Sequence, residues 1–204
     1  MTTVGAAMFT GIVEHLGIAT NVTDVDRGRT LTMDAGPVAA GVAVGDSIAI
    51  NGTCLTVVAV DEPLVSFQAI GETLDRTNLG RVQPGDQLNV ERPLAAAGRF
   101  DGHIVQGHVD GVGTVRSVED EGEGRRLWID PPSSLMRYIV EKGSITVDGV
   151  SLTVAATDDA GFEVAVIPHT LSVTTLGVRA PEDLVNIEVD VLAKYVERLL
   201  GASL

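Results

Sequence analysis

The sequence predicts an all-β protein that consists of two similar, small β-barrels in tandem, followed by a helix. Three observations predict this fold class: an internal repeat, apolar residues that alternate with polar ones along short segments, and clusters of Asp and Gly between these segments. Hydrophobic residues make up 45% of the chain but aromatic residues only 3%, so the cores must consist mainly of Val, Ile, Leu and Ala. The β-branched residues of this set favour strands.

The internal repeat consists of four sequence blocks that occur twice in the same order. The first block recurs after 96 residues and the other three after 97, as a one-residue gap between blocks would produce. Four blocks in one order make chance a poor explanation. The paired blocks are 10–14 with 106–110, 48–57 with 145–154, 72–80 with 169–177, and 89–91 with 186–188.

These blocks divide the chain into two modules and a tail. A chain of 204 residues accommodates two compact domains. We predict an N-terminal module at 8–96, a C-terminal module at 103–190 and an oligomerisation helix at 191–204, with the linker at 95–102 between the modules.

Within each module, the pattern is that of short strands separated by turns. Apolar residues recur at every second position, for example in 48–50 and 185–189, as expected for strands with one buried face. Asp and Gly cluster at 24–28, 119–124 and 158–161, where we expect turns. Many short strands with regular turns predict one closed or nearly closed barrel per module.

Helical segments are expected at few places. Residues 134–142 form a predicted helix that ends at Gly143, and 38–44 form a weaker counterpart before Gly45. In the tail, the apolar residues fall on one stripe of a helix. This stripe caps its own barrel or packs against other subunits, and we favour the second because the first module has no such stripe. The stripe contains Val191, Leu192, Tyr195, Val196, Leu199 and Leu200.

Composition argues against several classes of function. A net charge of −14 repels a nucleic-acid backbone. The single cysteine, Cys54, allows no intrachain disulfide and favours a reducing compartment. The four histidines show no zinc-binding spacing, so no metal is expected. Neither a signal peptide nor a long apolar run is visible, which predicts a cytoplasmic protein without a membrane anchor.

Several motifs carry a specific resemblance. They are MFTGIVE at 8–14, NGTCLT at 51–56, GHIVQGHVDG at 102–111, DGVSLT at 148–153 and two TxLGxxxPxD stretches. With these motifs the chain closely resembles the riboflavin synthases of the alpha-chain type. The resemblance implies tandem six-stranded Greek-key barrels, a homotrimer and a lumazine synthase as a candidate partner. It also implies the conversion of two 6,7-dimethyl-8-ribityllumazine molecules into riboflavin and 5-amino-6-(ribitylamino)uracil.

The implied reaction suits a duplicated module. It moves a four-carbon unit between two identical molecules, so donor and acceptor need similar pockets and no cofactor. In the family, one site forms between the first module of a subunit and the second module of its neighbour. The alternative is a non-catalytic lumazine-binding antenna protein, which would have lost ligand residues from one copy. Both copies keep theirs here, so we prefer the enzyme.

Equivalent segments of both modules are implied to bind the substrate. Phe9 matches the family's N-terminal aromatic residue, although seven residues precede the MFTG motif here. Lys142, which has no basic counterpart at the aligned position Val44, is otherwise a charge that complements a helix C-terminus, but the resemblance implies that it contacts the ligand. The remaining predicted contacts are Gly11, Ile12, Val13, Cys54, Leu55, Thr56, Gln68, Ala69, Ile70, Gly71, Glu72, Thr73, Gly107, His108, Val109, Ser151, Leu152, Thr153, Ala165, Val166, Ile167, Pro168, His169 and Thr170.

Candidate catalytic residues lie where the two copies differ. His108 replaces Ile12, and histidine is the residue type best suited to proton transfer near neutral pH; Thr153 is nearby in the family's pattern. Ser151 replaces Cys54, and both are implied to face the ligand. A lone cysteine is otherwise a small buried residue. A structural role for His103 is about as well supported as a functional one.

Two acidic residues complete the catalytic candidates. Asp148 replaces Asn51, where both residues are expected to form turns with the following glycine and only Asp148 has a charge-specific role. Asp190 stands where the first copy has Pro93, and the resemblance places it at the active site.

Overall fold

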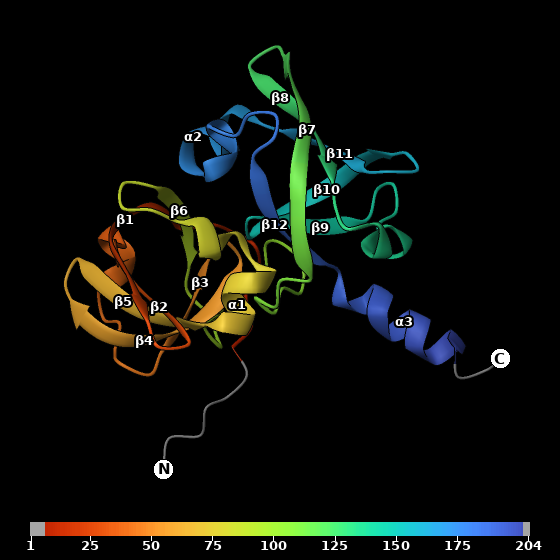
Figure 1. The fold of residues 1–204 in the computed structure, drawn as a ribbon. Helices are drawn as coiled ribbons and strands as arrows, with labels where there is room; N and C mark the ends of the chain where they lie inside the picture. Colours follow the sequence, from red (N-terminus) through yellow and green to blue (C-terminus); the bar gives the residue numbers. More distant parts are fainter. Residues whose placement is uncertain (1–6, 202–204) are drawn as a thin grey trace.

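Two closed, antiparallel six-stranded barrels follow one another along the chain in this computed structural model, which describes residues 7–201 (Figure 1). The strand order is β1-β2-β5-β4-β3-β6 in the first barrel and the equivalent β7-β8-β11-β10-β9-β12 in the second. The predicted tandem-barrel fold is confirmed. The first barrel contains β1 (His15–Val25), β2 (Gly28–Asp34), β3 (Ser47–Ile50), β4 (Thr53–Asp61), β5 (Leu64–Ile70) and β6 (Gln87–Glu91). The second contains β7 (Gly111–Glu121), β8 (Gly124–Asp130), β9 (Ser144–Val147), β10 (Val150–Thr157), β11 (Phe162–Val166) and β12 (Leu184–Val189).

Each barrel has its own apolar core and an equivalent set of turns and short helices. Alternate residues of the strands point inward, and Phe67 and Phe162 are fully buried in the two cores. The predicted turns at 24–28, 119–124 and 158–161 are confirmed, since each connects two paired strands. The helices are α1 (Gly71–Arg76), α2 (Pro168–Val173) and α3 (Val191–Gly201), with 3-10 helices at Gly36–Ala39, Asn78–Arg81, Ser133–Tyr138 and Thr175–Gly177.

The predicted helices inside the modules were wrong in type and length. Where a helix was predicted at 134–142, the structure has only the short 3-10 helix Ser133–Tyr138. Where one was predicted at 38–44, it has only the 3-10 helix Gly36–Ala39. Extended backbone at Ile139 ends the first of these, and the chain then turns at Lys142, whose φ is 64°. The N–H of Lys142 donates to Val154 as that of Gly45 donates to Val57. Lys142 is therefore equivalent to Gly45, one residue beyond the predicted Val44.

The two barrels meet at a pair of equivalent hairpins. Asn51 and Gly52 have φ values of 44° and 75°, and Asp148 and Gly149 have 47° and 78°. Both pairs thus form two-residue turns with a left-handed backbone, which confirms the turn role expected for them. The hairpins pack closely, because a Cβ atom on Gly52 would lie 2.7 Å from the backbone nitrogen of Gly149.

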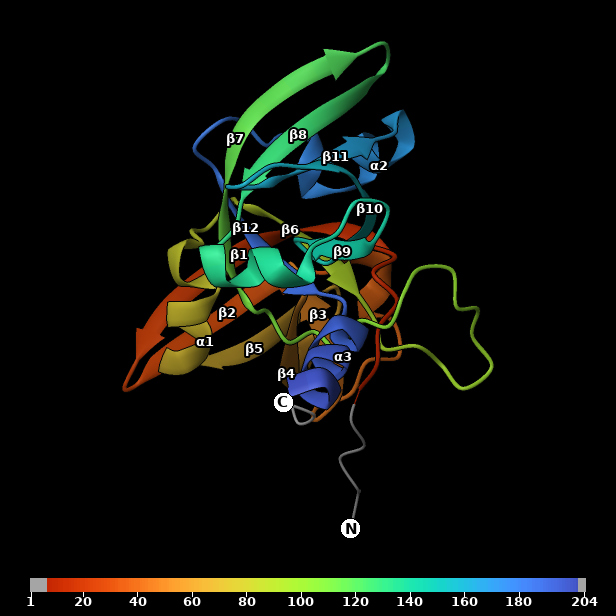
Figure 2. The same ribbon diagram turned by 90° about the vertical axis from the view of Figure 1, so that its right-hand side faces the viewer.

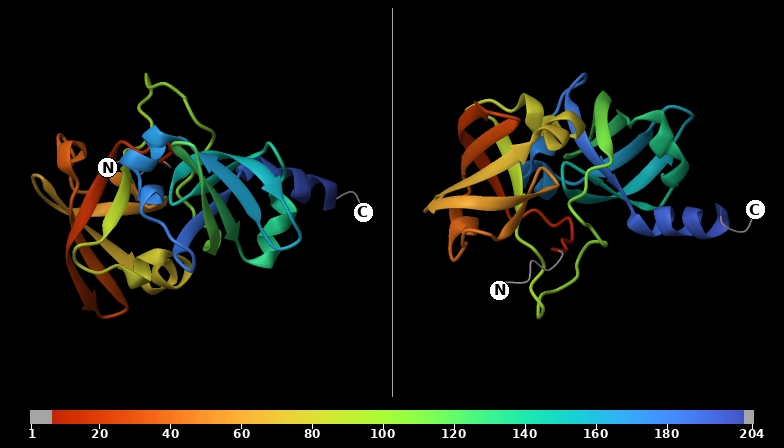
Figure 3. Two further views of the ribbon diagram at one scale, coloured as in Figure 1. Left: turned by 90° about the horizontal axis from the view of Figure 1, so that it is seen from above. Right: turned by 60° about the horizontal axis from the view of Figure 1, so that its bottom comes forward.

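Helix α3 projects away from both barrels (Figures 1 and 3). Its polar side is held by its own barrel, since Lys194 Nζ lies 2.6 Å from Asp110 Oδ1 and Tyr138 donates to Glu197. In its apolar stripe Val191 is buried, whereas the other members are each more than half exposed: Leu192, Tyr195, Val196, Leu199 and Leu200. Positions 202–204 of the predicted tail lie outside the described residues. Over the described part of the chain, the helices are too short or too polar to cross a membrane.

The linker 95–102 forms a loop that extends away from both barrels (Figure 2). It connects β6 to a segment that returns between the barrels before β7 begins. Phe9 and Val105 pair there in a short antiparallel bridge. The two segments that begin at the bridged residues, 9–13 and 105–109, are called the crossing segments below.

Candidate active site at two strand seams

Each barrel has a seam where two neighbouring strands separate. The β4–β5 ladder runs from Asp61–Leu64 to Val57–Phe67. Beyond that pair, Thr53–Thr56 pair with β3 and Gln68–Ile70 pair with β2. Two strand edges therefore face each other without forming a ladder, and their backbone groups are suited to hydrogen-bond the edge of a flat heterocycle.

The second barrel repeats this seam between β10 and β11. Their ladder ends at Val154–Val164, after which Val150–Thr153 pair with β9 and Ala165–Val166 pair with β8. Along the seam edges, every second side chain faces outward and is exposed or half-buried. The side chains between them face the barrel and are less exposed. The outward-facing side chains are Cys54, Thr56, Gln68 and Ile70 in the first module, and Ser151, Thr153, Ala165 and Ile167 in the second.

Each seam is covered by the crossing segment of the other module. The N–H of Ser151 donates to the carbonyl of Gly11 over 2.8 Å, and the N–H of Cys54 donates to that of Gly107 over 2.9 Å. Gly11 and Gly107 have φ values of 76° and 74°. A Cβ atom on Gly11 would lie 2.6 Å from Ser151 Cβ, and one on Gly107 would lie 2.7 Å from Cys54 Cβ. Only glycine fits either position.

The structure therefore sorts the predicted substrate contacts into two mixed sets. The segments from Cys54 to Thr56 and from Gln68 to Thr73 join Gly107, His108 and Val109 of the second module. The segments from Ser151 to Thr153 and from Ala165 to Thr170 join Gly11, Ile12 and Val13 of the first. Repeat alignment alone assigned each crossing segment to its own module.

The second seam contains a hydroxyl–imidazole pair. Ser151 Oγ and His103 Nδ1 lie 2.7 Å apart. Burial lowers the pKa of the His103 imidazole, while the nearby Asp190 carboxylate raises it. Burial is the larger effect, so the ring is mostly neutral at pH 7 and its Nδ1 can accept the Ser151 proton. His103 was left open by the sequence, although its equivalent, Ala7, carried a usable signal: only one copy has an imidazole there.

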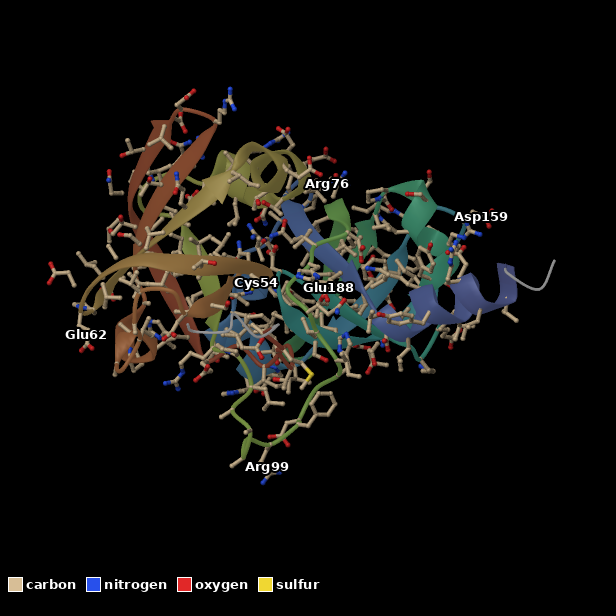
Figure 4. The ribbon with its side chains drawn as sticks, turned by 90° about the horizontal axis from the view of Figure 1, so that it is seen from below. Cys54, Glu62, Arg76, Arg99, Asp159 and Glu188 are labelled. Atoms are coloured by element: carbon tan, nitrogen blue, oxygen red, sulfur yellow. The ribbon has the colours of Figure 1, made fainter. Side chains whose placement is uncertain are left out.

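The first seam contains a thiol in place of this pair. Cys54 is half-buried and packs against the cluster of Phe9, Ala49 and Val105. Burial raises the pKa of the Cys54 thiol, a hydrogen bond with the Ser47 side chain lowers it, and the charge of Glu188 raises it. Figure 4 shows Cys54 and Glu188 close together where the modules meet. Burial dominates, so Cys54 is a thiol and not a thiolate at neutral pH.

The other candidate site residues differ in how far they are buried. The His108 side chain is exposed, and its backbone N–H donates to Glu188 Oε2 over 2.9 Å. Lys142 is exposed, next to the β10 strand that carries Thr153. Phe9 is completely buried against Ala49 and Val105, so it supports the crossing segment from behind. Asp190 accepts a hydrogen bond from the N–H of Leu192 at the start of α3.

Asp148 is not brought together with the other catalytic candidates. Its side chain has no exposed surface and lies between the barrels. It accepts hydrogen bonds from Asn78 Nδ2 and from the N–H of Asn186, each over 2.8 Å, and forms an ion pair with Arg179. A carboxylate bound in this way stabilises the contact between the modules, which favours a structural role for Asp148 over the catalytic role expected from the sequence.

Two buried carboxylates at the seams were missed by the sequence reasoning. Glu91 accepts hydrogen bonds from the N–H groups of Thr10 and Gly11, and Glu188 accepts them from those of Gln106 and His108. Burial raises the pKa of Glu91 to about 7 and outweighs these hydrogen bonds. The repeated NVE and NIE blocks carried the signal, since each retains a glutamate at a buried strand position. Among the described residues, His, Cys, Asp and Glu form no group of three able to hold a metal.

Comparison with known proteins places this architecture in a family. The model of the lumazine binding domain matches the chain twice, over residues 10–93 and 106–190. A riboflavin synthase of Mycobacterium bovis is 48% identical over 200 residues, which cover 96% of this chain and 100% of that protein. One of Schizosaccharomyces pombe is 39% identical over 97% of this chain and 96% of its own length.

Solved structures agree with the fold. A crystal structure of LumP complexed with riboflavin has a TM-score of 0.82 and 26% sequence identity, and covers 89% of this chain and 98% of its own. LumP complexed with 6,7-dimethyl-8-(1'-D-ribityl) lumazine has a TM-score of 0.81 at 22% identity with the same coverage. On the two domain matches and the near full-length relatives, the chain belongs to the riboflavin synthase family.

Proposed function

We propose that the two seams bind two molecules of 6,7-dimethyl-8-ribityllumazine and that the chain converts them into riboflavin and 5-amino-6-(ribitylamino)uracil. The observation that supports this most strongly is the repeated seam, covered in both modules by a glycine of the other module. One lumazine donates a four-carbon unit and the other accepts it. The atoms and electrons of the two substrates equal those of the two products, so no oxidant or reductant is needed.

Ring binding is assigned to the backbone and outward side chains of each seam. The strand edges at Gln68–Ile70 and Ala165–Val166 supply N–H and C=O groups, and the helices α1 and α2 that follow supply Thr73 and Thr170. Cys54 and Ser151 face the ring from the opposite edge. Holding two rings in fixed positions converts an encounter between two molecules into a nearly intramolecular step.

Proton transfer is assigned mainly to the second seam. The reaction needs a proton removed from the 7-methyl group of one lumazine and a nucleophile added at position 7 of the other. Neutral His103 accepts the Ser151 proton, so the Ser151 oxygen either attacks the ring itself or takes a proton from a water molecule that attacks the ring. Asp190 stabilises the imidazolium that results. Thr153 lies on the same face of β10 as Ser151, where it can orient the attacking group.

The first seam contributes His108 and the Cys54 thiol. His108 is exposed in the single chain, so its imidazole is available to a ring bound between subunits. We propose that the chain forms a homotrimer in which the first seam of one subunit faces the second seam of its neighbour. The exposed stripe of α3 supports an assembly, because contiguous apolar surface of this kind usually packs against a partner. Deletion of residues 191–204, followed by light scattering, tests this role.

An antenna protein that binds lumazine without turnover is the alternative. The complexes of LumP show that the same fold can carry a bound lumazine or riboflavin. Both seams are intact here, which favours the enzyme. Chelator-treated protein incubated with the lumazine alone should form riboflavin, as followed by absorbance. Bound ligand without product would support the antenna. A cytoplasmic location and an association with lumazine synthase stay predictions.

A further inference from the structure

We propose that Glu91 and Glu188 are positioning residues, and that each controls the ligand site on the other module's barrel. This inference rests on the proposed function, because it assigns the geometry of the two proposed sites to two side chains outside them. Neither glutamate lies on a seam edge. Both belong to the last strand of their barrel, β6 and β12.

Glu91 holds the crossing segment that covers the second seam. Its Oε1 accepts hydrogen bonds from the Thr10 N–H over 2.7 Å and from the Thr10 hydroxyl over 2.9 Å. Both of its oxygens lie 3.1 Å from the Gly11 nitrogen. The next group along the chain, the Gly11 carbonyl, accepts the hydrogen bond from Ser151. Glu91 thus fixes the Ser151 backbone through one turn of the chain.

Glu188 does the same at the first seam. Its Oε1 accepts from the Gln106 N–H over 2.7 Å and its Oε2 from the His108 N–H over 2.9 Å. The Gly107 carbonyl between these two groups accepts the hydrogen bond from Cys54. Glu188 therefore fixes His108 and the cover of Cys54 together.

A carboxylate is needed because each turn presents two N–H groups to one buried point. Glu91 and Glu188 are 5% and 4% exposed, so an unpaired N–H at this point has no water to replace the lost acceptor. Both oxygens of a carboxylate accept: at Glu188 the two N–H groups go to different oxygens, and at Glu91 the Gly11 N–H is shared between both. An amide would accept at one oxygen and turn its own N–H groups toward the remaining donor. Glu→Gln is therefore a nearly equal-volume change that loosens one crossing segment.

The arrangement predicts crossed effects. Loss of Glu188, a residue of the second module, should disturb Cys54 in the first. Loss of Glu91, a residue of the first module, should disturb Ser151 in the second and leave Cys54 unchanged. A purely structural role for both residues would instead weaken the whole molecule and expose Cys54 equally in both variants.

The test compares Glu91→Gln and Glu188→Gln with Glu163→Gln in the full-length chain at pH 8. Glu163 is 9% exposed and pairs with Arg126 on the barrel wall, so it controls for the loss of a buried carboxylate. Three quantities are measured: kcat and KM for riboflavin formation, the thermal midpoint, and the rate of Cys54 alkylation by iodoacetamide. Cys54 is the single cysteine of the chain, so alkylation reports on the first seam alone.

Glu91→Gln and Glu188→Gln should each lower kcat by about 10-fold with a smaller change in KM. A displaced catalytic group slows the reaction more than it weakens ring binding. Only Glu188→Gln should raise the alkylation rate, by several-fold, and shift its pH dependence to lower pH because a negative charge beside the thiol is lost. Glu188→Asp, which keeps two acceptor oxygens, should recover part of kcat.

Equal alkylation rates in Glu91→Gln and Glu188→Gln, or a fall in kcat no larger than in Glu163→Gln, would overturn the proposal. Failure of the proposed function has a different signature. In that case the unmodified chain makes no riboflavin, whereas the alkylation rates of the three variants still decide whether each glutamate acts across the module boundary.

Discussion

The two seams share a backbone and differ in the groups that can move protons. Glycines with the same conformation cover both, and equivalent glutamates hold both covers. At the second seam Ser151 pairs with His103, whereas in the first module Ala7 occupies the position equivalent to His103 and Cys54 packs against Phe9. The duplication has thus kept the parts that we propose hold a ring and changed the parts that we propose act on it. Two similar ligands bound at such sites experience different chemistry.

The largest effect is expected when the second module is removed. In a fragment of residues 1–96, the first seam loses its cover at Gly107, and the Thr10–Gly11 turn loses its contact at Ser151. Two copies can satisfy both by placing the turn of each over Cys54 of the other. We therefore expect a dimer that still binds riboflavin. Its turnover should be lower by at least about 10²-fold, because the proposed hydroxyl–imidazole pair is absent.

Light scattering, fluorescence titration and a product assay on one preparation test this fragment. A ligand-binding monomer would show that the cover is dispensable for binding. Turnover close to that of the full chain would show that catalysis does not need the second seam.

The repeat made the fold predictable, but it did not predict the contacts between the two copies. Periodicity and turn residues located the strands because they depend on neighbours in sequence. The exchange of Gly11 and Gly107 between modules depends on how the barrels pack, and alignment of the copies carries no information on packing. Asp148 shows the same limit: its difference from Asn51 pointed to chemistry, whereas its Arg179 partner reveals a buried ion pair.

The second prediction concerns this ion pair, which distinguishes the two hairpins at the junction. Asp148→Asn should leave the Arg179 charge without its buried partner and lower the free energy of unfolding by about 3–5 kcal/mol. The double variant Asp148→Asn/Arg179→Val reproduces the pair Asn51 and Val82 at the equivalent positions of the first module. It should recover much of the loss, since the unpaired charge is gone.

Denaturant unfolding of the two single variants and the double variant measures this coupling. Turnover per folded molecule should stay near that of the unmodified chain. Unchanged stability with a large fall in kcat would restore a catalytic role to Asp148.

The third prediction makes the second seam resemble the first. His103→Ala introduces the residue that the first module has at the equivalent position, and it should lower kcat by about 10²-fold by removing the base that accepts the Ser151 proton. Ser151→Ala should have a similar effect, and the double variant should lose little more, because the two groups act as a unit. Riboflavin affinity should change much less than kcat. Additive losses in the double variant would indicate that His103 and Ser151 act separately.

The smallest effect is expected in the pH dependence of stability, where Glu91 supplies the test. Burial raises the pKa of Glu91 from its ordinary value of 4.5 to about 7, so between these values the folded chain binds a proton that the unfolded chain releases. The contribution of Glu91 to stability is therefore complete below about pH 4.5 and is lost as the pH rises through about 7. The free energy of unfolding should fall across this window by up to about 1 kcal/mol per pH unit. Glu91→Gln, which cannot ionise, should show a flatter profile between pH 5 and about 8, whereas Glu14→Gln should retain the slope, since Glu14 is an exposed residue that pairs with Arg92 next to Glu91. Denaturant unfolding at closely spaced pH values measures all three profiles. Parallel profiles for Glu91→Gln and the unmodified chain would mean that the carboxylate stays ionised throughout, held by its N–H donors more strongly than burial opposes it.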